Sequence, residues 1–313
     1  MIDENKEEII TKVQNVHEQL NHASSYAMIR IITVDPGAFD VTVDEIKLWK
    51  DKSGKHCTGC IEGAMKQHAK VESSKPLYSE VPGEISAGDL MFIEAKADIK
   101  RPMLINVDVA TRLITGVSMR GRNEDECTNA TLQVKAEYAI HGRKMQVQVF
   151  DRESGMIPAE AKLKLEGIKV QFKAAGQKVA LAEVNIREIR IKARSAKAGV
   201  RSKYNYLPPN QFNVDLVLDS IQVLNRIPKE GKTKSPYELF TGKSIDYLRD
   251  MRVDWGEPII VERPRGIASD LTVTGQWAVV VRRIMNGTGV LKVYLIQQKK
   301  YAYRLKFQRA RAP

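Results

Sequence analysis

The spacing of apolar positions changes twice along the chain, and each change predicts a boundary between regions of different structure. Near the N-terminus, apolar side chains recur at the intervals of one helix face, at Ile9, Ile10, Val13, Val16 and Leu20. We therefore predict that residues 1–75 form a small, predominantly helical domain.

Residues 80–245 alternate apolar runs typical of strands with segments typical of helices, in the order βββαβαβα. Two later strands, near 145–150 and 168–174, are each followed by a helix, and a further helix is expected near 212–226. This order predicts an α/β domain that ends in a polar connector at 228–243. The first three strands are expected to form an antiparallel meander: DLMFIEAKA (89–97), PMLINVDVA (102–110) and RLITGVSMR (112–120).

The last region, residues 246–313, consists of short apolar runs with polar interruptions. Asn286 and Gly287 separate two such runs, QWAVVVRRIM and VLKVYLIQQ, and this dipeptide favours the tight turn of a β-hairpin. We predict a small all-β barrel in this region.

The composition is that of a soluble chain with two or three domains, because the 313 residues are 43% hydrophobic and 28% charged. No uncharged apolar run reaches the length of a membrane-spanning helix. The acidic N-terminus, MIDENKEEIITKVQ, is unlike a secretory signal. We therefore expect a protein that acts inside a cell and outside its membranes.

The net charge of +12 is distributed unevenly. Residues 246–313 contain thirteen Lys and Arg against six Asp and Glu, so seven of the twelve excess positive charges lie in this last part. A basic balance of this size favours a polyanionic partner, above all nucleic acid. The alternative is a solvated basic surface.

Two histidines and two cysteines form the pattern expected of a metal site. His17 and His22 stand about one helical turn apart, and Cys57 and Cys60 follow in the C-x-x-C of HCTGC. Imidazole and thiolate satisfy the tetrahedral preference of Zn²⁺, so we predict that these four residues bind one structural zinc ion. A redox role for CTGC is disfavoured because no thioredoxin-like βαβ pattern surrounds it. Alternative ligands are His56 and His68.

Three carboxylates in the middle region are candidates for a site that holds divalent cations. Asp89 lies in the first predicted strand, Asp151 directly follows a later one, and Glu183 lies on the long helix that begins near residue 180. Two-metal phosphoryl transfer needs carboxylates from separate elements that converge on paired Mg²⁺ ions. Each acid alone also has an ordinary explanation, as a turn former or a solvated helical residue. Rival acids on the same sheet are Asp108 and Glu94.

The long helix also carries a basic stripe. Arg187, Arg190 and Arg194 follow Glu183 at positions i+4, i+7 and i+11, so all four lie on one helix face. A basic stripe beside a metal-binding acid suits a DNA phosphate backbone. A solvated charged face with one Glu–Arg pair is the alternative explanation.

Taken together, these motifs resemble those of retroviral and retrotransposon integrases, most closely the copia type. The H-x4-H and C-x2-C pairs are similar to the integrase zinc domain. GDLMFI, VFDRESG and ALAEVNIREI are similar to the three acid-bearing segments of that family, and SPYELFTGK (235–243) is similar to the segment that closes the copia-type core. The resemblance covers about residues 15–245 and extends, with weaker motifs, to the basic tail.

The resemblance implies a multidomain α/β protein with three parts. Residues 1–75 would form a helical HHCC zinc-binding domain. Residues 80–245 would form an RNase H-like catalytic core, in which a mixed five-stranded sheet packs with helices. Residues 246–313 would form a small, basic, SH3-like β-barrel that binds DNA.

The resemblance also implies an activity. Asp89, Asp151 and Glu183 would be the catalytic acids and would hold two Mg²⁺ or Mn²⁺ ions, with Glu188 as the alternative third acid. The protein would process the 3′ ends of element DNA and join them to double-stranded target DNA. It would act as a homo-multimer on DNA in the nucleus, after a stage in a cytoplasmic particle.

Two other functions share these features. The chain could be a catalytically inactive, domesticated protein that binds DNA or assembles complexes and depends on zinc. It could also be an RNase H-like nuclease that cuts RNA in RNA–DNA hybrids. Intact acids favour an enzyme, and the flanking zinc and basic regions favour an integrase.

Overall fold

The computed structural model describes seven stretches of the chain: residues 4–52, 57–64, 77–96, 99–152, 155–173, 179–262 and 275–309. Contacts along the chain divide it into two units. Unit 1 comprises Met1–Met65, Lys192–Ser220 and Ile245–Pro313, and unit 2 comprises Lys66–Ile191 and Ile221–Ser244. The division into domains 1–75, 80–245 and 246–313 stays a prediction.

Unit 2 is built on a mixed five-stranded sheet with the strand order β3-β2-β1-β4-β5. The first three strands pair antiparallel and so form the predicted meander, while β4 runs parallel to both β1 and β5. The predicted mixed five-stranded sheet is therefore confirmed. Its strands are β1 (Ile85–Lys96), β2 (Ile99–Asp108), β3 (Ile114–Ser118), β4 (Val147–Phe150) and β5 (Lys169–Phe172).

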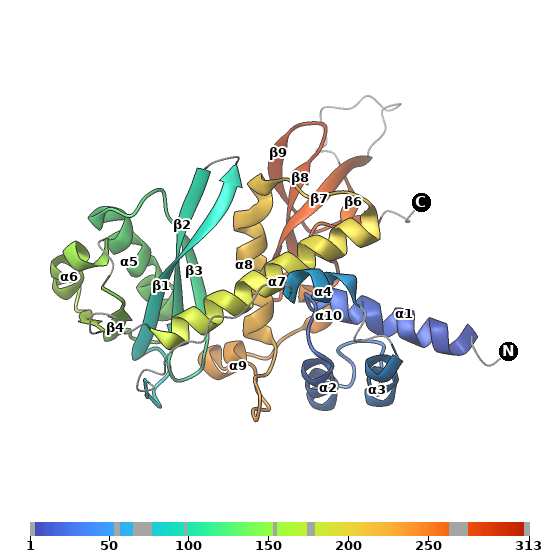
Figure 1. Cartoon of the computed structure of the whole chain (residues 1–313), viewed down its shortest axis with the longest axis horizontal. Coiled ribbons are helices and arrows are strands. Elements are labelled where there is room, and N and C mark those ends of the chain that lie inside the picture. The colour runs from blue at the N-terminus through green and yellow to red at the C-terminus, as the bar shows by residue number, and fades with distance from the viewer. Residues whose placement is uncertain are drawn as a thin grey trace. The chain divides into compact units, whose positions relative to one another are not determined.

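Helices cover both faces of this sheet (Figure 1). On one face, α5 (Glu124–Ile140) and α6 (Met156–Leu165) pack with Leu90 and Phe150, and Cys127 of α5 is fully buried among them. The start of α7 (Ala180–Tyr204) packs on the other face, where Val179 and Ala182 contact Ala87 and Val149. Side chains alternate between the two faces of a sheet along each strand. The residue two positions after Ala87 in β1 therefore also lies on this second face.

Helix α8 (Asn213–Arg226) completes the edge of the sheet. The Asn225 side chain accepts a hydrogen bond from the Ile114 amide at 2.8 Å and donates one to the Ile114 carbonyl at 2.7 Å. The amide therefore satisfies backbone groups that an edge strand would otherwise leave without a protein partner. No sequence pattern indicated this contact.

The segment 228–243 differs from its prediction as a connector, because it contains α9 (Pro236–Thr241). Ser235 accepts a hydrogen bond from the Glu238 amide, and the Glu238 carboxylate accepts one from the Ser235 amide. This reciprocal capping box stabilises the first turn of a helix. Gly242 then ends the helix in the left-handed conformation at φ 72°, which glycine adopts without strain.

Unit 1 contains the N-terminal helices and the C-terminal sheet. Five strands pair antiparallel in the order β10-β6-β7-β8-β9, and Asn286 and Gly287 lie in the turn between β7 and β8 as predicted. The antiparallel sheet is confirmed, and its assignment as an SH3-like barrel stays a prediction.

The helices of unit 1 are α1 (Glu4–Gln19), α2 (Ser25–Val34), α3 (Val43–Lys52), α4 (Thr58–Ala64), α10 (Tyr247–Asp250) and the 3₁₀ helix η1 (Asn210–Phe212). The strands are β6 (Pro258–Glu262), β7 (Gly275–Ile284), β8 (Val290–Leu295), β9 (Lys300–Arg304) and β10 (Gln308–Arg309).

A buried ion pair joins three parts of unit 1. Arg283 of β7 is 1% exposed and Asp219 of α8 is fully buried. The Arg283 guanidinium donates to both carboxylate oxygens of Asp219, at 3.0 and 2.5 Å, and to the carbonyls of Gln19 and Val253. One side chain thus links α8, the end of α1 and the C-terminal sheet.

Across the described stretches, none of the helices combines the length and the apolar character that a bilayer crossing requires.

Candidate metal centre and carboxylate site

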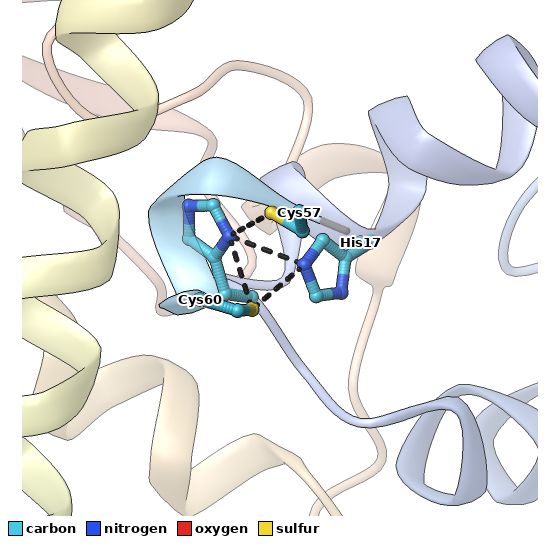
Figure 2. Close-up of side chains that lie close together, drawn as sticks. His17, Cys57 and Cys60 are labelled. Carbon is cyan, nitrogen blue, oxygen red and sulfur yellow. Dashed lines mark hydrogen bonds between the residues drawn. The ribbon is translucent and has the colours of Figure 1, made fainter. Parts of the chain in front are cut away.

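The four predicted zinc ligands lie together in unit 1. His17 belongs to the last turn of α1, and His22 follows that helix in the link to α2. Cys57 directly precedes α4 and Cys60 lies in its first turn. The imidazole nitrogens and the thiol sulfurs point toward one common centre (Figure 2).

The distances between the donor atoms fit a tetrahedral zinc ion. His17 Nε2 lies 3.1 Å from His22 Nδ1 and 3.2 Å from Cys60 Sγ. His22 Nδ1 lies 3.3 Å from Cys57 Sγ and 3.6 Å from Cys60 Sγ. Zinc bonds of about 2.0 Å to nitrogen and about 2.3 Å to sulfur, at tetrahedral angles, would separate such donors by about 3.3 to 3.8 Å. The His₂Cys₂ set can therefore hold a zinc ion.

The backbone around His22 is shaped to bring its ring into this centre. Asn21 and His22 both adopt left-handed conformations, with φ of 52° and 60°, and the His22 amide donates to the His17 carbonyl at 2.7 Å. A Cβ atom added at Gly59 would lie 2.5 Å from His22 Cε1, and one at Gly199 would lie 2.8 Å from His22 Nε2. Both positions must stay without a side chain for the ring to keep its place.

Further contacts orient the other ligands. His17 Nδ1 lies 2.8 Å from the Ala23 carbonyl, which directs Nε2 into the metal centre. The Gln14 amide donates to Cys57 Sγ at 3.5 Å and accepts a hydrogen bond from Trp49 Nε1 at 3.1 Å. The Trp49 ring packs against His17 with the ring centroids 4.9 Å apart.

The electrostatics of the group suit a bound cation. Burial lowers the pKa of the His17 imidazole, which favours the neutral form that binds metals. The hydrogen bond from the Cys60 thiol lowers the pKa of the Cys57 thiol, which favours the thiolate form that binds a cation. The alternative ligands His56 and His68 lie outside the described residues.

Asp89 and Asp151 lie side by side in unit 2. Strands β1 and β4 pair in parallel from Ile85 with Val147 to Gly88 with Phe150, and the two aspartates each come one residue after that last pair. A Cβ at Gly88 would lie 2.4 Å from Phe150 Cε1, so the neighbouring side chain fills this space.

Glu183 follows a residue of α7 that packs on the sheet. By strand alternation, Asp89 shares a face with Ala87, whereas Asp151 comes directly after the last residue of β4. That face packs against Ala182, the residue next to Glu183 in the first turn of α7. A shared position of all three acids on one side of β1 and β4 stays a prediction.

The carboxylate groups themselves are not drawn into a tight cluster. Among the described residues, only the His₂Cys₂ group brings three or more potential ligand atoms within 4.8 Å of one another. Three carboxylates repel one another until a cation lies between them. The roles of these acids as catalytic residues and magnesium ligands stay predictions.

The rival acids have structural partners. Asp108 is buried at the end of β2, where its carboxylate accepts hydrogen bonds from the Gly83 amide and from the amide and hydroxyl of Thr111. Burial raises the pKa of Asp108. Glu94 is exposed and lies opposite Lys100 in the β1–β2 pair, further along β1 than Asp89.

Glu188, the alternative third acid, forms an ion pair with Lys229, with the ammonium 3.0 Å from Oε2. Glu183 is the acid in the first turn of α7. Which of the two is the third acid stays a prediction, with Glu183 as the first candidate.

The three arginines of the basic stripe on α7 differ in how exposed they are. Arg187 and Arg190 are exposed within unit 2. Arg194 is half-buried within unit 1, where its Nε donates to the Gly63 carbonyl of α4 at 3.0 Å. Arg187 and Arg190 therefore keep the better access to a DNA backbone, and DNA binding by all three stays a prediction.

Neither a protein-family model nor a curated protein sequence matches this chain. A chain from the cryo-EM structure of the simian T-cell lymphotropic virus intasome, in complex with the PP2A regulatory subunit B56 gamma, is similar at 11% identity and a TM-score of 0.48. That similarity covers 96% of this chain and 98% of the other. Two structures of the HTLV-2 integrase catalytic core domain in complex with magnesium, trimeric and dimeric, cover 51% of this chain and 97% of their own. Their identities are 15% and 14%, and their TM-scores are 0.40 and 0.39.

Proposed function

We propose that this chain is a retrotransposon integrase of the copia type, which joins the 3′ ends of element DNA to target DNA. The observation that carries the proposal is the register of β1 and β4, which sets Asp89 and Asp151 side by side. Asp89 shares the face of the sheet that the first turn of α7 covers, and that turn carries Glu183. Three acids from three elements would thus converge on two metal ions, as two-metal phosphoryl transfer requires.

The acids and the arginines would have separate roles in the reaction. Asp89, Asp151 and Glu183 would hold two Mg²⁺ or Mn²⁺ ions, which when bound supply activation of the attacking oxygen and stabilisation of the leaving oxygen. Arg187 and Arg190 would hold the phosphate backbone of the element end along the exposed face of α7. The same site would carry out both the processing of the ends and their transfer to target DNA, without a covalent enzyme intermediate.

The His₂Cys₂ centre would hold one structural zinc ion. Its ligands come from α1, α4 and the link between α1 and α2, so a bound ion would cross-link elements that are about 40 residues apart in the sequence. Binding free energy in such a site contributes directly to folding. The function of this centre would therefore be to hold the N-terminal helices in place.

The proposed reaction also defines the partners. Two element ends must be joined together, so the protein would act as a homo-multimer on double-stranded DNA. The excess of positive charge in residues 246–313 supports a DNA-binding role for the C-terminal sheet. Because the target is chromosomal DNA, the protein would work in the nucleus after a stage in a cytoplasmic particle.

The test is to incubate the purified chain with labelled donor-end duplexes, a target plasmid and Mg²⁺. We expect joined products from the native chain and at least a thousandfold loss in Asp151→Asn, since removal of a metal-binding charge costs roughly 4 kcal/mol of transition-state stabilisation. The matched control is Asp125→Asn, which changes an exposed aspartate of α5 that pairs with Lys162.

The outcomes separate the three candidate functions. Joining at native rates by Asp151→Asn would remove the catalytic assignment. DNA binding without any joining by the native chain would favour an inactive assembly protein. Magnesium-dependent cleavage of an RNA–DNA hybrid, with no joining of duplex ends, would favour a nuclease.

A further inference from the structure

A groove of about 460 Å³ lies in unit 2, apart from the three acids. Its walls come from the segment before β1, the turn between β2 and β3, and the link from α8 into α9. The segment before β1 ends near Ile85, and Asp89 lies four residues further along the strand. At about 3.3 Å per residue, this separates the groove from Asp89 by roughly 13 Å.

The walls combine apolar and basic side chains. The apolar contributions include Leu77, Val109, Pro236 and Leu239. The basic contributions are Arg112, Lys229, Lys232 and Lys234, and the acidic ones are Glu80 and Glu230, so the lining carries an excess of two positive charges.

The lysines of the α8–α9 link differ in whether they form an ion pair. Lys229 forms an ion pair with Glu188 at 3.0 Å. Lys232 and Lys234 are exposed, and neither ammonium forms an ion pair with a carboxylate of the described residues. A turn presents these two lysines to solvent. Gly231 adopts the left-handed conformation in it, at φ 74°, and the Lys232 amide donates a hydrogen bond to the Lys229 carbonyl.

We propose that this groove is a docking site for a partner-protein peptide in which acidic residues alternate with apolar ones. The carboxylates of such a peptide would pair with Lys232, Lys234 and Arg112 along the rim. Its apolar side chains would cover the half-buried Leu77 and Leu239 and so remove their remaining exposed surface from water.

A nucleic-acid backbone fits the same groove less well. A duplex presents about one negative charge per 1.7 Å of its axis and offers no apolar side chain to the walls. Glu80 and Glu230 would repel such a continuous row of phosphates, whereas a peptide can place an apolar or neutral residue opposite each of them. The mixed lining therefore favours a peptide.

The test measures binding of a fluorescein-labelled peptide, in which glutamate and aspartate alternate with leucine and phenylalanine, by fluorescence anisotropy at physiological salt. The charge-reversal pair is Lys232→Glu with Lys234→Glu. The matched control is Arg187→Glu with Arg190→Glu, which changes the net charge equally at exposed positions of the same unit. We expect the lysine pair to weaken peptide binding about tenfold or more and the arginine pair to leave it within about twofold.

A second ligand, the donor-end DNA duplex, is measured with the same variants. We expect the opposite pattern, in which the arginine pair weakens DNA binding and the lysine pair does not. Equal losses of peptide binding in both pairs would show only an effect of net charge and would overturn the docking site. No binding to the native chain, or displacement of the peptide by DNA, would overturn it as well. Thermal unfolding of each variant checks that a loss reflects the groove and not the fold.

Discussion

The ion pair between Asp219 and Arg283 should be among the largest single contributions to the stability of unit 1. Asp219→Ala would leave the Arg283 guanidinium, which is 1% exposed, with only the carbonyls of Gln19 and Val253. Removal of one partner from a buried pair costs about 3–5 kcal/mol, because the remaining charge stays buried without compensation. About 4 kcal/mol corresponds to an unfolding equilibrium that is several hundredfold less favourable to the folded state.

Urea unfolding followed by tryptophan fluorescence measures this change. The three tryptophans, Trp49, Trp255 and Trp277, all belong to unit 1, so their signal reports on that unit. With a slope of about 2 kcal/mol per molar urea, the midpoint should fall by roughly 2 M. The control Asp44→Ala breaks a 3.1 Å pair with Lys47 that is mostly exposed, and it should cost less than about 1 kcal/mol.

A double variant tests the reasoning behind the magnitude. Asp219→Leu with Arg283→Met replaces both charges by apolar side chains, and it should recover most of the stability lost in Asp219→Ala. If Asp219→Ala costs no more than Asp44→Ala, the buried pair does not stabilise unit 1. If the double variant is as unstable as Asp219→Ala, the loss comes from shape and not from the buried charge.

Two further predictions concern the metal centre. Native protein should contain one zinc ion per chain by atomic absorption. Cys57→Ser should lose this ion, because the hydroxyl of serine is a far weaker zinc ligand than thiolate. A metal-free native chain would contradict the assignment. Gly199→Ala should weaken zinc binding in a chelator competition, since its Cβ would lie 2.8 Å from His22 Nε2. Gly121→Ala, where a Cβ meets nothing within 4 Å, is the control, and equal zinc affinity in the two variants would show that His22 can move without loss.

The His₂Cys₂ group that could hold a metal was predicted from sequence because the spacing is local within each pair. The residues that orient them could not, since Trp49 reaches Gln14 across 35 positions of sequence and neither residue type is characteristic of zinc sites. The same holds for the glycines that pack on His22. Their signal is the space around an imidazole ring in the folded chain, which no motif encodes.

Unit 2 shows a similar division. Hydrophobic periodicity predicted the strands of its mixed sheet. Asn225 and Ile114 lie 111 positions apart, so their contact arises only after the sheet has formed. The helix at Pro236–Thr241 could have been predicted, because Ser235 and Glu238 stand at the capping-box spacing, but the breaker-rich flanks favoured a connector.

The three cysteines are protected from solution by different means. Cys127 is enclosed in the core of unit 2, whereas the buried Cys57 and the half-buried Cys60 would gain further shielding from a coordinated ion. A maleimide reagent therefore distinguishes two kinds of damage in one preparation. Two alkylated sulfurs per chain would report an emptied metal centre in intact protein, and a third would report that unit 2 has opened.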